Sequence, residues 1–371
     1  MSLAWSADMK VGSPKEIKNQ EYRVGLTPAG VKELVDNGHD VIIEAKAGEA
    51  IGFRDEAYVS AGGSIAANAD EVFAFADLIV KVKEPQPVEI EKLQPKHTLF
   101  TYLHLAPDPV QSRGLMKSGA TCIAYETVTD RQGKLPLLVP MSEVAGRLGT
   151  QVGAQLLQIN NGGPGILLGG VTGTSTAKVT VIGGGIAGTN AAMMAIGLDA
   201  DVTVLDRSTE RLRDLHAILD GRAKLRFSTS SSVSEAVRDS DLVIGSVLIP
   251  GASAPKIVSA EDIAAMRPGS VVVDIAIDQG GCFETSKPTS HKEPTYIVDE
   301  VTHYCVTNMP ALAARTATEA LSNVTLPFAL QLANKGTDKA LAENSYLAEG
   351  LNVKAGKITH SEVIRSLNFS E

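Results

Sequence analysis

The sequence is poor in cysteine, in aromatic residues and in long apolar segments. Its 371 residues include three cysteines, one tryptophan and 4% aromatic residues. Cys122, Cys282 and Cys305 have no metal-ligand spacing and are too scattered for a disulfide framework, which fits a reduced cytoplasm. No apolar run approaches the roughly 18 residues that span a bilayer, so we expect no membrane segment.

Basic tracts and a secretion signal are also missing. The net charge is −9, which excludes a typical nucleic-acid-binding surface. The N-terminus has no basic-then-apolar pattern, so we expect a cytoplasmic protein. Residues 1–8, which contain Trp5, are interpreted as an appended or frayed leader, with the natural start at Met9.

The strongest positive signal is a glycine-rich turn in residues 179–192, between a β-branched run and a small-residue run. Gly183, Gly185 and Gly188 have the spacing G-x-G-x-x-G. These glycines permit, in that order, a tight turn, close approach to a pyrophosphate, and close packing of the next helix on the sheet. The helix N-terminus then directs free N–H groups at the phosphates. The pattern predicts a dinucleotide-binding βαβ unit, although a ligand-free strand-to-helix turn can have the same spacing.

An acidic residue follows the next predicted strand, residues 201–205, about 20 residues after the turn. A carboxylate at Asp206 would accept hydrogen bonds from an adenine ribose and would repel a 2′-phosphate, which favours NAD over NADP. Arg207 keeps NADP open, because a guanidinium beside the acid could accommodate the phosphate.

Strand and helix signals alternate through most of the chain, which predicts parallel sheets covered by helices. We expect an α/β fold of two Rossmann-like doubly wound parallel-sheet domains, the N-terminal one completed by the C-terminal segment. The predicted domains are residues 9–136 with 312–371, which lack a phosphate-binding glycine pattern, and residues 137–311, which contain the glycine turn. Two long helices, 142–158 and 316–335, would cross between them, the second kinked at Pro327.

Several polar residues stand at the ends of predicted strands, where parallel sheets place their ligands. In the first domain these are Arg23, Lys83, His104 and Glu126, and in the second domain Asp278. An arginine can hold a carboxylate, a lysine can polarise a carbonyl, and a histidine can transfer a proton near neutral pH. The set suits oxidation of a small amino acid. Taken singly, Arg23 and Lys83 could be surface charges and His104 a partly buried structural histidine. Glu126 could be an ion-pair partner, and Asp278 a turn former.

Five segments closely resemble the L-alanine dehydrogenases, a family related to the nucleotide-binding subunit of proton-translocating transhydrogenase. They are residues 15–24 (KEIKNQEYRV), 81–85 (KVKEP), 103–106 (LHLA), 140–146 (PMSEVAG) and 274–281 (DIAIDQGG). The resemblance extends from Met9 to the C-terminus. It implies two Rossmann-like domains, a homohexamer, a role in amino-acid catabolism, and conversion of L-alanine, NAD⁺ and water to pyruvate, ammonium and NADH.

The resemblance also implies a role for individual residues. Arg23 and Lys83 would hold the substrate carboxylate and carbonyl oxygen, His104 would be the main proton donor and acceptor, and Asp278 would assist. The residues that would bind NAD are Ser142, Gly183, Gly185, Gly188, Asp206, Arg211, Ser228, Val247, Leu248, Ile275, Asp278, Lys287, Val306, Asn308 and Met309. Without the resemblance, Ser142 could be a helix N-cap, Asn308 a turn residue and Arg211 part of a solvated helix face.

One departure concerns a metal. Some relatives carry a histidine near the end of the long C-terminal helix that pairs with a glutamate at position 126, whereas this chain has Asn334, Lys335 and Gly336 there. We therefore expect no intrinsic metal. Two other functions stay open: the nucleotide-binding subunit of a transhydrogenase, and an NADH-binding regulator without catalysis. Glycine and glyoxylate remain open as side substrates.

Overall fold

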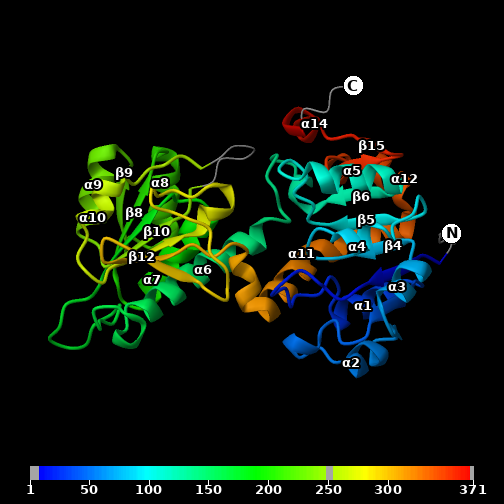
Figure 1. Ribbon diagram of the computed structural model, residues 1–371, viewed down its shortest axis with the longest axis horizontal. Helices are drawn as coiled ribbons and strands as arrows, with labels where there is room; N and C mark the ends of the chain where they lie inside the picture. The colour runs from blue at the N-terminus through cyan, green and yellow to red at the C-terminus, as the bar shows by residue number, and fades with distance from the viewer. Residues whose placement is uncertain (1–7, 248–253, 368–371) are drawn as a thin grey trace. The chain divides into compact units, whose positions relative to one another are not determined.

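The computed structural model describes residues 8–247 and 254–367 and divides the chain into two compact units (Figure 1). Unit 1 comprises Met1–Met141 and Ala314–Glu371, and unit 2 comprises Ser142–Ala313. Nearly all of the predicted leader, residues 1–7, lies outside the described residues. Within the described ranges, no helix is both long and apolar enough to cross a membrane.

Unit 1 contains an eight-stranded sheet in the order β15-β14-β6-β5-β4-β1-β2-β3. The six strands from β6 to β3 are all parallel, in the order of a dinucleotide-binding fold. The antiparallel β14 and β15 come from the C-terminal segment and extend one edge. The strands are β1 Lys10–Ser13, β2 Asp40–Glu44, β3 Ser64–Ala66, β4 Leu78–Val80, β5 Thr98–Thr101, β6 Thr121–Ala124, β14 Leu351–Lys354 and β15 Lys357–Ile358.

Unit 2 repeats this architecture with seven strands in the order β12-β13-β11-β10-β7-β8-β9. Six strands are parallel, and only β12 is antiparallel. The strands are β7 Lys178–Ile182, β8 Asp201–Asp206, β9 Lys224–Phe227, β10 Leu242–Gly245, β11 Val271–Asp274, β12 Thr295–Val298 and β13 Val301–Tyr304. The predicted class, two Rossmann-like α/β domains with the first completed by the C-terminal segment, is therefore confirmed.

Helices connect the parallel strands, and their ends follow local sequence signals. Thr27 caps α1 and accepts a hydrogen bond from Gly30 N at 3.1 Å, whereas Gly119 ends α5 with φ 71°. The helices are α1 Pro28–Asp36, α2 Asp55–Ser60, α3 Ala69–Phe75, α4 Pro87–Ile90, α5 Pro109–Ser118, α6 Val139–Leu156, α7 Ile186–Gly197, α8 Thr209–Ile218, α9 Ser230–Arg238, α10 Ala260–Ala264, α11 Ala314–Lys335, α12 Thr337–Glu343, α13 Ser345–Ala348 and α14 Ser361–Leu367.

The structure differs from the sequence-based expectation mainly at strand ends. Glu126 and Asp278 were expected at the ends of strands but lie beyond them: β6 ends at Ala124 and β11 at Asp274, and 3₁₀ turns follow, η2 (Tyr125–Thr127) and η4 (Ile275–Gln279). Tyr125 of η2 and Ala276 and Ile277 of η4 are buried although they lie outside the sheets, and an apolar run alone does not distinguish a buried turn from a buried strand. Both turns carry candidate site residues, Glu126 and Asp278.

Candidate active site

The strand order places the candidate residues at the point where a doubly wound sheet binds ligands. In such a sheet, successive connections leave in opposite directions from two central strands, and a crevice opens at the carboxyl ends of that pair. In unit 1 the pair is β1 and β4, which precede Arg23 and Lys83. In unit 2 the pair is β7 and β10, which precede Gly183 and Val247.

Arg23 is buried, and a carboxylate on its own segment fixes its orientation. Its Nε and Nη2 donate to the two carboxylate oxygens of Glu21 at 2.7 and 2.6 Å, and its side chain is 2% exposed. Burial alone would lower the pKa of Arg23, but Glu21 outweighs burial and raises it. Nη1, on the opposite side of the guanidinium from Glu21, lies 3.1 Å from Met141 Sδ. A guanidinium held in this way presents a fixed direction to an incoming carboxylate.

Lys83 follows β4 and is mostly enclosed, with its side chain 12% exposed. Its Nζ lies 3.7 Å from Glu84 Oε2, and its carbonyl oxygen accepts from Thr101 Oγ1 at 2.9 Å. Burial raises the pKa of Glu84, but Lys83 and Lys18 outweigh that effect and lower it, so Glu84 remains an anion beside the two ammonium groups.

His104 has an uncommon backbone conformation that a glutamate stabilises. Its φ is 49°, in the left-handed region, and its N–H donates to Glu126 Oε1 at 2.5 Å. Leu103 N donates to the same carboxylate at 3.1 and 3.2 Å. The imidazole stacks on Tyr102 with 5.8 Å between ring centroids, and its Nδ1 lies 3.9 Å from Glu126 Oε1. The side chain is 48% exposed, so His104 is accessible to a substrate.

The carboxyl ends of four neighbouring strands thus carry Arg23, Lys83, His104 and Glu126. Tyr102 joins them: it stacks on His104, donates to Leu137 O at 2.6 Å, and lies close enough to Arg23 for the guanidinium to oppose the rise in its pKa that burial causes. The fifth polar candidate, Asp278, lies in unit 2 within η4 and is exposed.

The glycine turn of unit 2 has the geometry that its spacing predicts. Gly183 has φ 96°, and a Cβ added to Gly188 would lie 1.8 Å from Gly183 O. A Cβ on Gly185 would meet nothing within 4 Å, so the backbone at the N-terminus of α7 faces open space. A dinucleotide pyrophosphate fits this arrangement, since two glycines close the turn and the third leaves room beside free N–H groups.

Asp206 and Arg211 both contact this turn. Asp206 ends β8 and accepts from Gly184 N at 2.7 Å and from Ser208 N at 2.8 Å. Arg211 Nε donates to Gly184 O at 2.6 Å, and its Nη2 donates to Thr189 Oγ1 at 2.8 Å. The alternative that Arg211 belongs to a solvated helix face is therefore wrong, because its guanidinium lies against the turn.

Most of the other cofactor candidates of unit 2 occupy segments that follow its strands. Ser142 is the fourth residue of α6, so the N-cap alternative is wrong for it. Asn308 has φ 59° before η5 (Met309–Ala313), which agrees with a turn residue. Leu248 lies outside the described residues. The positions that follow strands are Ser228 after β9, Val247 after β10, Ile275 and Asp278 after β11, and Val306, Asn308 and Met309 after β13, while Lys287 lies between η4 and β12.

Sequence reasoning missed a buried carboxylate that organises this region. Asp274 is 0% exposed; its Oδ1 accepts from Ala276 N at 3.1 Å, and its Oδ2 accepts from Cys282 N at 2.8 Å and Ser286 Oγ at 2.5 Å. Burial raises its pKa, which these hydrogen bonds oppose. Asp274 therefore fixes the start of η4, which carries Asp278. Only its position at the end of an apolar strand could have indicated this role.

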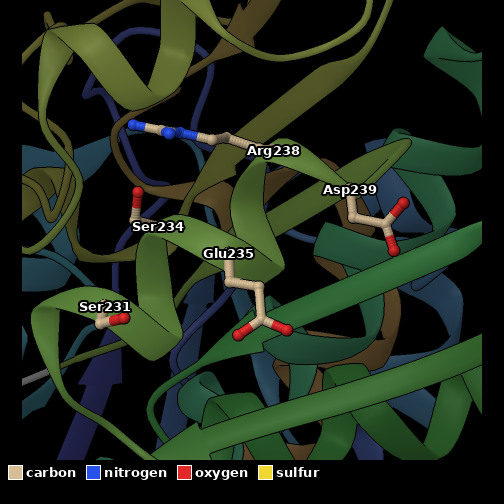
Figure 2. Close-up of a pocket in the computed structure, with 5 residues that line it drawn as sticks. All are labelled: Ser231, Ser234, Glu235, Arg238 and Asp239. Atoms are coloured by element: carbon tan, nitrogen blue, oxygen red, sulfur yellow. The ribbon is translucent and has the colours of Figure 1, made fainter.

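Neither the metal candidates nor the surface pocket adds to this site. Among residues 8–247 and 254–367, no three His, Cys, Asp or Glu side chains group as metal ligands, and Asn334 Oδ1 lies 2.8 Å from His39 Nε2. A surface pocket of about 530 Å³ lies along α9. Figure 2 shows the five residues that line it. It contains no predicted site residue, and ion pairs engage its Glu235, Arg238 and Asp239. This pocket is a feature of surface packing.

Comparison with known proteins finds matches over nearly the full length of the chain. The family models "Alanine dehydrogenase/PNT, N-terminal domain" and "Alanine dehydrogenase/PNT, C-terminal domain" match residues 12–145 and 149–361. Alanine dehydrogenase of Halomonas elongata is 58% identical over 361 residues, 97% of each chain. That of Bacillus subtilis is 52% identical over 362 residues, 97% of this chain and 95% of the relative.

Solved structures agree with these sequence matches. An L-alanine dehydrogenase superposes with a TM-score of 0.94 at 49% identity, covering 96% of this chain and 99% of that chain. A transhydrogenase from Sinorhizobium meliloti has a TM-score of 0.82 at 24% identity, over 95% of this chain and 99% of that chain, and this similarity shows a shared fold alone. The chain belongs to the alanine dehydrogenase/PNT family.

Proposed function

We propose that this protein is an NAD-dependent dehydrogenase that reversibly converts L-alanine to pyruvate and ammonium. The observation that carries the proposal is that Arg23 follows β1 and Lys83 follows β4, the two central strands of the unit 1 sheet, with His104 after the neighbouring β5. The relatives named alanine dehydrogenase, at 52–58% identity over nearly the full length, support the same activity.

In this proposal, Arg23 and Lys83 bind and orient the substrate. Arg23, whose orientation Glu21 fixes, would bind the substrate carboxylate. Lys83, enclosed beside Glu84, donates to the carboxylate or to the carbonyl oxygen of pyruvate. Enclosure strengthens both contacts because water screens them less. Holding the Cα in one orientation supplies much of the rate enhancement, since a correctly placed reactant avoids an entropic cost.

His104 transfers the protons. Once Cα of the neutral amine has lost its hydride to the bound cofactor, an iminium remains. The imidazole takes a proton from the water that attacks the iminium carbon and returns it to the amino nitrogen of the resulting carbinolamine. The carbinolamine then collapses to pyruvate, and its hydroxyl proton passes to the departing ammonia, which leaves as ammonium. Glu126 holds the backbone of His104 in place by accepting from its N–H at 2.5 Å. Proton transfer of this kind contributes about 10²–10⁴-fold. Asp278 is proposed to assist by orienting the water or ammonia.

The cofactor is proposed to be NAD, held by unit 2. A bound nicotinamide supplies the hydride acceptor. The glycine turn would hold the pyrophosphate, and Asp206 would accept from the adenine ribose while repelling a 2′-phosphate. Ser142, Arg211, Ser228, Val247, Ile275, Lys287, Val306, Asn308 and Met309 are proposed to complete this site.

One assay separates this function from the alternatives. Purified protein with NAD⁺ should form NADH, followed by its absorbance, when L-alanine is added, and should form pyruvate and ammonium in equal amounts. Parallel samples contain glycine or no amino acid, and a further sample replaces NAD⁺ with NADP⁺. NADH binding without turnover of any amino acid would contradict the proposal and favour a regulator or a transhydrogenase subunit. A homohexamer is proposed for the assembly, which light scattering would test.

A further inference from the structure

A fully buried ion cluster is centred on Lys81, two residues before Lys83, and none of its members was among the candidate site residues. Lys81 Nζ donates to Glu16 Oε2 at 3.1 Å and to Glu89 Oε1 at 2.7 Å. The lysine side chain is 0% exposed, and each glutamate side chain is 2% exposed. Burial lowers the pKa of Lys81, but the two carboxylates outweigh it and raise the pKa, so the ammonium stays charged.

Each glutamate uses one oxygen for Lys81 and the other for the backbone. Glu16 Oε1 accepts from Val82 N at 2.7 Å and from Lys83 N at 3.3 Å. Glu89 Oε2 accepts from Gln86 N at 2.8 Å, at the start of α4. The two carboxylates therefore have the same kinds of partner, Lys81 and backbone N–H groups. Of the two, Glu16 alone accepts from the N–H of Lys83, whose ammonium is the candidate substrate ligand.

We propose that Glu16, held by Lys81, is a positioning residue for substrate recognition: it fixes the backbone of Lys83 and thereby the direction in which Lys83 meets the substrate. This inference rests on the proposed function, because it assigns Glu16 to the same substrate site. Lys83 has its carbonyl oxygen held by Thr101 and its N–H held by Glu16, so both of its peptide groups are anchored.

Stability alone does not account for this cluster. Buried ion pairs are costly to desolvate, and apolar residues of similar volume often replace them without loss of stability. Binding sites, in contrast, depend on buried hydrogen bonds behind the residues that touch the ligand, because displacements near 1 Å weaken recognition. A carboxylate that binds Lys81 and the Lys83 peptide at once supplies that rigidity.

The test compares Glu16→Gln with the matched control Glu89→Gln. An amide has one acceptor oxygen where a carboxylate has two. In each variant, the new glutamine therefore cannot accept from both Lys81 and the backbone N–H groups that the glutamate had bound. Each variant keeps the other glutamate as a carboxylate partner for Lys81. For Glu16→Gln we expect KM for L-alanine to rise about tenfold or more, with KM for NAD⁺ within about twofold. Amide hydrogen exchange at Val82 and Lys83 should accelerate about tenfold or more. For Glu89→Gln we expect a similar fall in Tm, with KM for L-alanine within about twofold of wild type.

The outcomes separate the proposal from a purely structural role. If Glu16→Gln leaves KM and amide exchange unchanged, or if Glu89→Gln raises KM as much, the proposal is wrong. If Glu16→Gln does not fold, Glu16→Asp replaces it, because it keeps the charge for Lys81 while its shorter side chain loses reach to the Lys83 N–H. If the wild type does not oxidise L-alanine, the proposed function fails, and the exchange rates still decide whether Glu16 anchors Lys83.

Discussion

Substituting Gly188 by alanine tests the dinucleotide site through a contact that the structure defines closely. The added Cβ would lie 1.8 Å from Gly183 O and 2.6 Å from Ser246 Oγ. The first atom is backbone, so the turn itself must move by about 1 Å or more to reach an ordinary contact distance. A displacement of this size costs about 10²-fold in a positioned interaction, or about 2.7 kcal/mol, and overpacking adds about 1–3 kcal/mol of lost stability.

Gly197→Ala on the same helix is the control. It is the last residue of α7, and its added Cβ would meet nothing within 4 Å. Alanine is the better helix former by up to about 1 kcal/mol, so this variant should be as stable as the wild type or more so. The assay is the Kd for NADH, measured by calorimetry, together with Tm. Gly188→Ala should bind NADH about 10²-fold more weakly, and wild-type affinity in that variant would refute the role of the turn.

Three further predictions concern proton transfer, cofactor choice and pH. His104→Ala should lower kcat about 10²–10⁴-fold in steady-state assays while Kd for NADH stays unchanged, and equal losses in both would contradict its role. Asp206→Asn should raise KM for NAD⁺ about tenfold or more and improve the ratio of NADP⁺ to NAD⁺ efficiency, because the carboxylate no longer repels the 2′-phosphate. Burial lowers the pKa of His97 below its usual 6.5, and His97 Nδ1 accepts from Gln94 N at 2.9 Å. As the pH falls, His97 is therefore protonated in the unfolded chain before it is protonated in the folded protein. The free energy of unfolding should then fall between pH 7 and 5 by at most about 1.4 kcal/mol per pH unit for this group. In urea denaturation at a series of pH values, His97→Gln should show a smaller fall than the wild type.

Local signals in the sequence predicted the parts of the fold that local interactions determine. The glycine spacing predicted the turn at Gly183 and Gly188, because the positive φ and the close approach to a carbonyl both require a residue without a side chain. Strand-terminal polar residues predicted the grouping of Arg23, Lys83 and His104, because parallel strands bring their carboxyl ends to one edge. Their roles in catalysis remain predictions that the variants above test.

Contacts distant in sequence account for what the sequence did not reveal. Lys81 alternates with apolar neighbours as an ordinary strand residue would, and its partner Glu16 lies 65 positions away. Asp274 reads as the end of a strand, although its carboxylate binds a loop that returns at Cys282 and Ser286. The edge strands β14 and β15 have four and two residues, which is too short for an alternation of apolar and polar residues to predict them. They join the sheet through the pairing of β14 with β6, which is distant in sequence.

The most direct test of the central claim is a crystal structure of the protein with NADH and pyruvate. The account predicts the pyruvate carboxylate within hydrogen-bond distance of Arg23 and Lys83, its carbonyl near His104, and the pyrophosphate at the Gly185 N–H. Pyruvate bound away from these three side chains, or a dinucleotide away from the glycine turn, would contradict it.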